Sequence, residues 1–424
     1  MHTEKLAFLG LILALPFLFQ MFQYLGDVPP LWAFSKVLPL VLAPLTVLGL
    51  LRLRLPHVGL AMLVLAYVTL VSPALSMLQL QNNLPEALAG SVKVWAFSFY
   101  FAAAFLLVAL RVTEAALTRA LLWLAAISFV LLWLLWLTVP AELYGLKPAG
   151  ESIFLWDEDR GRRLLLPMAF GLIGMFWLAR RFAERPAIWP ALLLGLALVS
   201  LLMILKYRTV IAATAMLVLW GMSGGFRRRL PALFWGMAIG GGALALAVTP
   251  LVTPMLGGTV GASLGGSLTV RQNSTDVLLR FLGEDPWRWL IGVGGSTDFS
   301  RISIQDILRT RDFFFADLGW LGLVGEYGVL GSALILLLHL AALRETRRAM
   351  RLAPTPLRCA LHDFMLYQLI TSVVLSLVLT PGQVVTVMAL TVYLQRLGLP
   401  IRHASPPSWP AATTRIGAPS RWPS

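Results

Sequence analysis

The sequence predicts an all-α membrane protein that crosses the bilayer about twelve times and carries a long outer loop containing amphipathic helices. Its composition is the first observation behind this fold class: 58% of the 424 residues are hydrophobic, 13% are charged, and the mean hydropathy is +0.80. A soluble domain has roughly a quarter charged residues, so lipid must be the solvent for most of this chain. The spacing of the apolar runs and the distribution of lysine and arginine are the other two observations.

Apolar runs long enough to cross a ~30 Å hydrocarbon core alternate with polar connections. The first run is interpreted as a membrane helix, because no small-residue cleavage site of a signal peptide follows it. The last run is short, and Pro381-Gly382 joins it tightly to its neighbour. The predicted spans are 6–22, 34–51, 58–78, 92–110, 119–139, 164–179, 188–205, 209–225, 231–255, 317–341, 360–380 and 382–396.

Lysine and arginine residues orient these spans. With the N-terminus inside, twenty of the 34 cations fall in cytoplasmic connections or tails, which is the positive-inside pattern. Both termini are therefore expected in the cytoplasm. Residues 1–403 form the predicted membrane domain, with 256–316 as its large outer loop, and residues 404–424, rich in Pro, Ser and Ala, form a disordered cytoplasmic tail.

Orientation leaves twelve cations on the predicted outer side unexplained. A net charge of +14 would suggest nucleic acid in a soluble protein, but the membrane accounts for much of it here. Lys36 and Lys93 are interpreted separately, as side chains that reach the lipid interface from outer helix ends. The unexplained set predicts an anionic ligand, and consists of Lys147, Arg160, Arg162, Arg163, Lys206, Arg208, Arg271, Arg280, Arg288, Arg301, Arg309 and Arg311.

Four of these cations have individual interpretations. Lys206 and Arg208 lie in a very short turn between two apolar runs, where contact with lipid headgroups and ligand binding are about equally supported. An amphipathic helix on the membrane surface is expected after Arg271, with Asp276 and Arg280 as an i,i+4 ion pair. That pair is the favoured explanation of Arg280, whereas Arg271 has no evident partner and is the better ligand candidate.

Two carboxylates belong to the predicted span 317–341. Glu326 lies well inside the apolar run, where a carboxylate is costly and is either functional or paired with an arginine or a backbone group. Asp317 lies at the outer mouth of the same helix and faces the arginine-rich loop. The five histidines and the single cysteine, Cys359, have no metal-ligand spacing, so we expect no metal, no cofactor and no disulfide.

The second half of the chain, about residues 155–340, resembles the family of O-antigen polymerases and O-antigen ligases. Arg271, an amphipathic stretch and then Pro286-Trp-Arg-Trp-Leu-Ile-Gly292-Val-Gly294 are similar to the family's R…P-hydrophobic-G-x-G segment. The stretch from Asp317 to Gly331, with Glu326-Tyr-Gly328 inside it, is similar to its H-N-x-Y-L…E-x-G-x-x-G segment.

Two further matches lie earlier in the chain. Arg208 is similar to the arginine of the family's S-R motif, and Arg160-Gly-Arg162-Arg163 resembles an earlier loop arginine. The ligases carry a histidine where this chain has Asp317, which favours a polymerase.

The resemblance implies a metal-independent inverting glycosyltransferase in the bacterial inner membrane, with a periplasmic active site and no cofactor. Its donor is an undecaprenyl-diphosphate-linked glycan. On this reading Arg208 and Arg271 hold the diphosphate, Arg162 or Arg163 assists, and Arg280 is a further candidate ligand. Asp317 either removes the proton of the acceptor hydroxyl or orients an arginine. Glu326 and Lys206 have supporting roles.

The implied partners are the lipid-linked glycan, membrane lipid and a chain-length regulator, with no nucleic acid. Two alternatives remain open. A ligase would transfer the glycan to lipid A-core. A lipid-linked oligosaccharide flippase would show an internal repeat and charged residues inside several spans, and neither is evident in the sequence.

Overall fold

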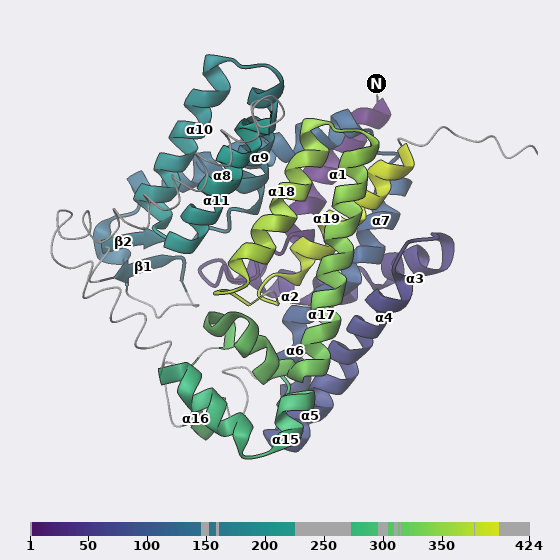
Figure 1. Ribbon diagram of the computed structural model, residues 1–424, viewed down its shortest axis with the longest axis vertical. Helices are drawn as coiled ribbons and strands as arrows, with labels where there is room; N and C mark the ends of the chain where they lie inside the picture. Colours follow the sequence, from purple (N-terminus) through teal and green to yellow (C-terminus); the bar gives the residue numbers. More distant parts are fainter. Residues whose placement is uncertain are drawn as a thin grey trace, which may run out of the picture.

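A computed structural model describes residues 2–145, 152–157, 161–224, 273–295, 304–308, 313, 315–376 and 378–397. These residues are predominantly helical, as predicted. Figure 1 shows long helices packed side by side, with α8–α11 on one flank and α17–α19 at the centre. The described residues also contain one pair of short strands, which the sequence did not predict. The predicted span 231–255, Arg271 and the tail 404–424 lie outside the described residues.

The helices overlap the apolar runs, although several of them begin or end well away from the predicted borders. They are α1 (His2–Leu18), α2 (Pro29–Val41), α3 (Ala43–Arg52), α4 (Val58–Ala66), α5 (Ser72–Gln79), α6 (Leu84–Ser91), α7 (Phe99–Ala109), α8 (Glu114–Thr138), α9 (Ala169–Glu184), α10 (Ile188–Ser200), α11 (Arg208–Met222), α15 (Pro286–Ile291), α16 (Ile304–Leu308), α17 (Gly319–Leu352), α18 (Pro356–Thr371) and α19 (Pro381–Leu397). Short helical turns join or extend them: η1 (Tyr67–Val71), η2 (Val92–Ser98), η3 (Ala141–Leu143), η4 (Leu201–Leu205) and η5 (Phe315–Leu318). A further helix occupies residues 273–283.

Six helical segments of the described chain are long and apolar enough to cross a membrane. They are Pro29–Arg52, Val58–Gln79, Leu84–Ala109, Glu114–Thr138, Ile188–Leu205 and Gly319–Leu352. Thr209–Met222 is a shorter apolar helix. Helices α1, α9, α18 and α19 coincide with four more predicted spans but have only 16 or 17 residues each. The chain is therefore a helical protein with several potential membrane helices, and twelve spans stay a prediction.

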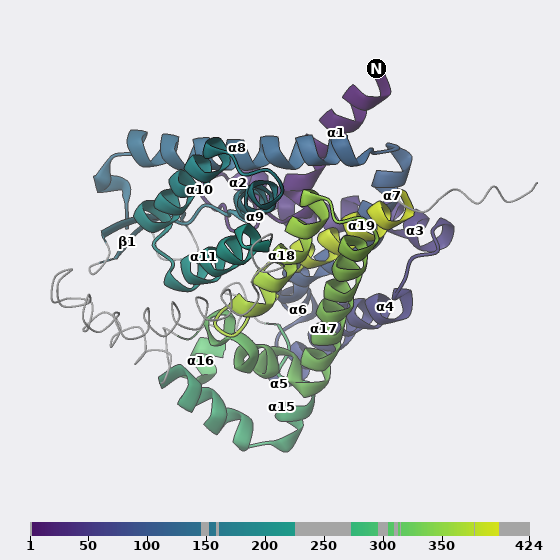
Figure 2. The same cartoon turned by 45° about the horizontal axis from the view of Figure 1, so that its top comes forward.

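The most buried helices lie at the centre of the bundle. Helix α19 is buried from Pro381 to Gln395 and packs against α7 and α17, while α9 packs against α8, α11 and α18. In Figure 2, α8 runs along one edge of the molecule, with α9 and α11 beneath it. Because the outward faces of α8 and α10 carry exposed Leu, Val and Trp side chains, these helices suit a lipid environment.

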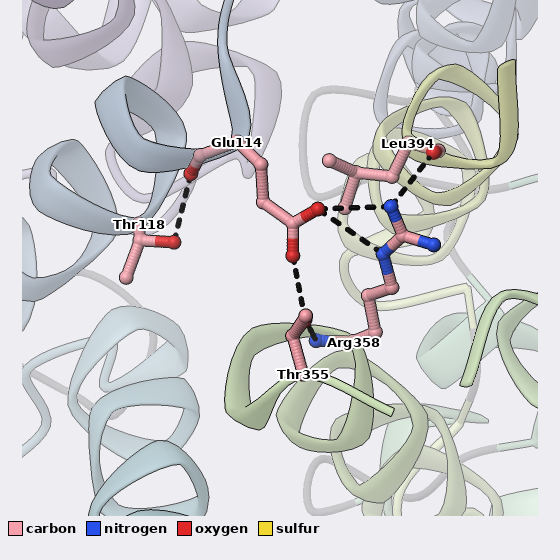
Figure 3. A network of polar contacts seen from close by, with 5 residues as sticks. All are labelled: Glu114, Thr118, Thr355, Arg358 and Leu394. Carbon is pink, nitrogen blue, oxygen red and sulfur yellow. Dashed lines mark hydrogen bonds and ion pairs between the residues drawn. The ribbon is translucent and has the colours of Figure 1, made fainter. Parts of the chain in front are cut away.

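Buried ion pairs join the helices at one end of the bundle. Arg358 of α18, 3% exposed, donates to the Glu114 carboxylate at the start of α8 and to the Leu394 carbonyl of α19. Thr355 donates to the other Glu114 oxygen at 2.5 Å, so one carboxylate connects two helix starts (Figure 3). Arg180 holds Asp363 through two hydrogen bonds of 2.5–2.6 Å. We call the end of the bundle that contains the Arg358–Glu114 and Arg180–Asp363 pairs the basic end.

Helix α17 contains a break that receives an extended segment of the chain. Gly328 has φ 66° and ψ 177°, which is not helical. The freed carbonyls of Gly325 and Glu326 accept hydrogen bonds from Val293 and Gly294 at 3.1 and 2.9 Å. A side chain at Gly292 or Gly328 would collide with the backbone of the other segment, so glycine is required at this crossing.

Candidate functional site

Arg162 and Arg163 lie on a short antiparallel hairpin of β1 (Phe154–Asp157) and β2 (Gly161–Leu164). The hairpin is fixed to the loop between α1 and α2, because Asp27 accepts hydrogen bonds of 2.9 Å from the Ser152 hydroxyl and the Ile153 amide. It also packs against η4. Figure 1 shows β1 and β2 at the left flank of the bundle.

Three of the predicted ligand cations lie against aromatic rings, and two of them share one ring. The Arg162 guanidinium carbon lies 4.2 Å from the centre of the Trp136 ring, and the Lys206 ammonium lies 5.7 Å from the same ring. The Arg163 guanidinium carbon lies 5.1 Å from the Tyr207 ring. Each contact is within the range of a cation–π interaction. We call these five residues the cation–aromatic cluster.

The backbone around Lys206 explains why this cation belongs to the cluster. Residues Leu201–Leu205 widen into a π-helical turn, and Lys206 ends it with φ 56°, in the left-handed region. Helix α11 then begins at Arg208. Only Tyr207 lies between Lys206 and the N-terminus of α11, whose free amides and dipole favour an anion. The short turn noted in the sequence is therefore a sharp reversal between two helices.

Tyr144 borders the cluster from the other side. Its ring meets Trp136 edge-on at 6.3 Å and Phe154 of the hairpin at 5.4 Å. Burial raises the pKa of the Tyr144 phenol, and the positive charge of Arg162 opposes that effect. Tyr144 therefore stays a neutral hydroxyl at physiological pH, so it adds no negative charge to a site rich in cations.

Glu326 does not belong to the cation–aromatic cluster. It pairs with Lys93, a cation expected from the sequence to reach the lipid interface. The Lys93 ammonium of η2 is 2.8 Å from Glu326 Oε1, and the Tyr327 hydroxyl donates to the same oxygen at 3.0 Å. Glu326 is 3% exposed. Glu326 is thus paired with a lysine, and not with the arginine or backbone group that the sequence suggests as a partner. Lys93 and Glu326 both interrupt apolar runs, and this shared feature is the sequence signal that indicates a pair between them.

The two glycine-containing segments that carried the family resemblance meet in space. Gly292-Val-Gly294 runs along Glu326-Tyr-Gly328 at the break of α17. The Tyr67 hydroxyl lies 2.9 Å from the Ile291 carbonyl and 2.7 Å from the Tyr327 carbonyl, so it bridges the two segments. Gly295 N–H donates to Ser72 Oγ at 3.0 Å, which fixes the segment to α5 as well. The crossing positions Glu326 beside Lys93.

The remaining predicted site residues lie apart from the cluster or outside the described residues. Asp317 lies in η5, exposed, directly before α17. Arg280 is exposed on helix 273–283, but the predicted ion pair with Asp276 is absent between these two described residues. Arg288 instead pairs with Glu284 at 2.9 Å. Arg288 also donates to the Phe281 carbonyl and lies over the Phe281 ring.

The described residues contain no group of three His, Cys, Asp or Glu side chains placed to hold a metal ion. The cation–aromatic cluster instead offers guanidinium and ammonium donors, which bind phosphate or carboxylate oxygens. No family model matches the chain, and no curated protein matches it in sequence.

Proposed function

We propose that this protein is a membrane glycosyltransferase that polymerises or transfers undecaprenyl-diphosphate-linked oligosaccharide, with polymerisation favoured over ligation. The observation that carries the proposal is the cation–aromatic cluster beside the start of α11. Planar guanidinium groups bind diphosphate oxygens through two parallel hydrogen bonds, and the stacked rings hold those groups in place before the ligand arrives. Arg162 and Arg163 are the proposed diphosphate ligands there, with Lys206 supporting them.

The proposed orientation places the basic end in the cytoplasm and the hairpin on the periplasmic side of the inner membrane, with both termini inside. Buried ion pairs account for Arg180 and Arg358, whereas exposed cations such as Arg185 and Arg351 remain at that end to satisfy the positive-inside rule. A lipid-linked donor would then reach the cation–aromatic cluster from the outer leaflet.

In the proposed reaction an acceptor sugar hydroxyl attacks the anomeric carbon of the donor, and the lipid diphosphate leaves. Arg208 and Arg271 would hold the leaving group with the cluster, and Asp317 would accept the hydroxyl proton or orient an arginine. The exposure of Asp317 suits contact with an acceptor. Arg280, also exposed, is a further candidate ligand for the diphosphate.

Deleting the gene in its host and examining the envelope glycan tests the proposal directly. Loss of long chains with single repeat units remaining supports a polymerase. Long chains left on the lipid carrier indicate a ligase, and repeat units retained inside the cell indicate a flippase, which would overturn the proposal.

Complementation with variants then tests the cluster. Arg162→Gln should reduce long-chain glycan, whereas Arg185→Gln, an exposed arginine at the basic end, should not. Equal glycan in both strains, at equal protein level in the membrane, would contradict a diphosphate role for the cluster. Arg208→Ala and Arg271→Ala test the resemblance in the same way, and wild-type activity of Asp317→Asn would exclude the base role.

A further inference from the structure

A second pair of cations lies outside the cation–aromatic cluster, on α2 and η2. Lys36 and Lys93 are both partly buried, and the two elements that carry them, α2 and η2, pack against each other. We propose that Lys36 and Lys93 form a second anion site, which takes the phosphate group of a membrane-embedded lipid. The proposal rests on the geometry of α2, η2 and α17, and does not depend on the proposed function.

The charges around this lysine pair do not balance. Glu326 neutralises Lys93 at 2.8 Å, and Tyr327 occupies the same carboxylate oxygen. Among the described residues, no carboxylate forms an ion pair with Lys36. Burial and the nearby Glu326 carboxylate raise the pKa of the Tyr24 phenol, so Tyr24 stays neutral. The group therefore carries a net positive charge in a partly buried place, and such a charge is stabilised by an anion.

The walls around Lys36 hold its ammonium in position without satisfying it. The ammonium lies 5.5 Å from the centre of the Trp32 ring and 5.9 Å from that of Tyr24. An aromatic face attracts the charge but accepts at most a weak hydrogen bond, and an ammonium has three N–H donors. The Tyr24 hydroxyl donates to the Leu379 carbonyl at 2.7 Å, which fixes this ring. The Lys36 ammonium is thus held in place while its N–H donors remain available to an anion.

The surface next to Lys36 favours a lipid over a soluble phosphate. Trp32, Lys36 and Leu40 follow one another at i,i+4 spacing, so they form one stripe of α2. Leu40 is 58% exposed, and the adjacent Val37 is 50% exposed. An acyl or isoprenoid chain can lie along these apolar side chains while its phosphate reaches the lysine pair. A free phosphate would use only the ammonium groups.

The experiment measures binding of farnesyl diphosphate to the purified full-length protein in detergent, beside inorganic diphosphate and farnesol as probes. Lys36→Gln removes the charge, and Lys36→Met does so while keeping the apolar stem. Lys36→Arg keeps the charge. Lys5→Gln, an exposed lysine on α1, is the matched control for loss of one positive charge. Native mass spectrometry counts the bound molecules, and titration gives the dissociation constants.

We expect Lys36→Gln and Lys36→Met to lose one bound farnesyl diphosphate, or to bind it about tenfold or more weakly, since both variants remove charged hydrogen-bond donors. Lys36→Arg and Lys5→Gln should behave as wild type. If inorganic diphosphate bound as tightly as farnesyl diphosphate, and its binding also required Lys36, the site would bind a soluble anion and the lipid assignment would be wrong. Unchanged stoichiometry and affinity in both uncharged variants, or farnesol binding as tightly as farnesyl diphosphate, would overturn the site.

Discussion

Replacing Gly328 by alanine should destabilise the protein strongly, because the break of α17 needs both the backbone freedom and the small size of glycine. Its φ of 66° and ψ of 177° fall in a region that other residues occupy at a cost of about 1–3 kcal/mol. A Cβ there would also lie closer than 3.0 Å to backbone atoms of Leu290, Ile291 and Gly292. Such overpacking typically costs another 1–3 kcal/mol, so the expected total is about 2–6 kcal/mol.

Gly195 in α10 provides the matched control for this substitution. No heavy atom lies within 4 Å of a Cβ built on it, and its backbone is helical. Gly195→Ala should therefore be neutral or stabilising by up to about 1 kcal/mol. Thermal unfolding of both purified variants in the same detergent, followed by the loss of the monodisperse protein peak, measures the difference. If Gly328→Ala unfolds at the same temperature as Gly195→Ala and wild type, the crossing of the two glycine segments is not tightly packed.

Three further predictions concern single contacts. Lys93→Met should destabilise the protein by about 3–5 kcal/mol because it leaves Glu326 buried without its cation, and adding Glu326→Gln should restore much of that loss in the same melting assay. A double variant no more stable than Lys93→Met would refute the pairing. Arg358→Met should cost a similar amount through loss of its contacts to Glu114 and should lower the amount of protein in the membrane, as measured by immunoblot. Trp136→Ala should weaken binding of inorganic diphosphate several-fold by releasing the stacked cations, and unchanged affinity would show that stacking does not order them.

The apolar pattern predicted the helices well because a chain in lipid must satisfy its backbone within each segment. The predicted span 188–205 coincides with Ile188–Leu205, and 58–78 nearly coincides with Val58–Gln79. The span predicted at 92–110 begins earlier, at Leu84. Asn83 and Glu86 form a capping box that starts this helix, and this local signal marks the earlier start in the sequence itself.

The hairpin that holds Arg162 and Arg163 could not be predicted in the same way. Each strand has only four residues, too few for a clear alternation of polar and apolar side chains. Its position also depends on the hydrogen bond between Ser152 and Asp27, which are 125 residues apart. The loop cations are evident in the sequence, but the rings that contact them come from α8 and from the turn before α11.

Partners distant in sequence also separate cations with structural roles from those available to a ligand. Counting charges assigned Arg180 and Arg358 to orientation, yet their carboxylates lie 183 and 244 residues away along the chain. The same count assigned Lys93 to lipid, although Glu326 pairs with it. A sum of charges in a loop predicts an orientation but carries no information on pairing, because pairing depends on contacts between helices.

The loop between α1 and α2 connects the two proposed anion sites. Asp27 holds the hairpin through Ser152 and Ile153, and Tyr24, three residues earlier, packs beside Lys36 and donates to Leu379. A single short segment therefore contacts both sites. On the proposed function, a polymerase must hold two lipid-linked glycans at a constant separation while one is transferred to the other, and such positioning lowers the entropic part of the barrier. Weakening the Asp27 contacts should then impair transfer more than binding at Lys36. The hairpin would shift, while Lys93 would stay fixed by Glu326 of α17, and Lys36 by the Trp32 ring of its own helix and by Tyr24, which Leu379 holds.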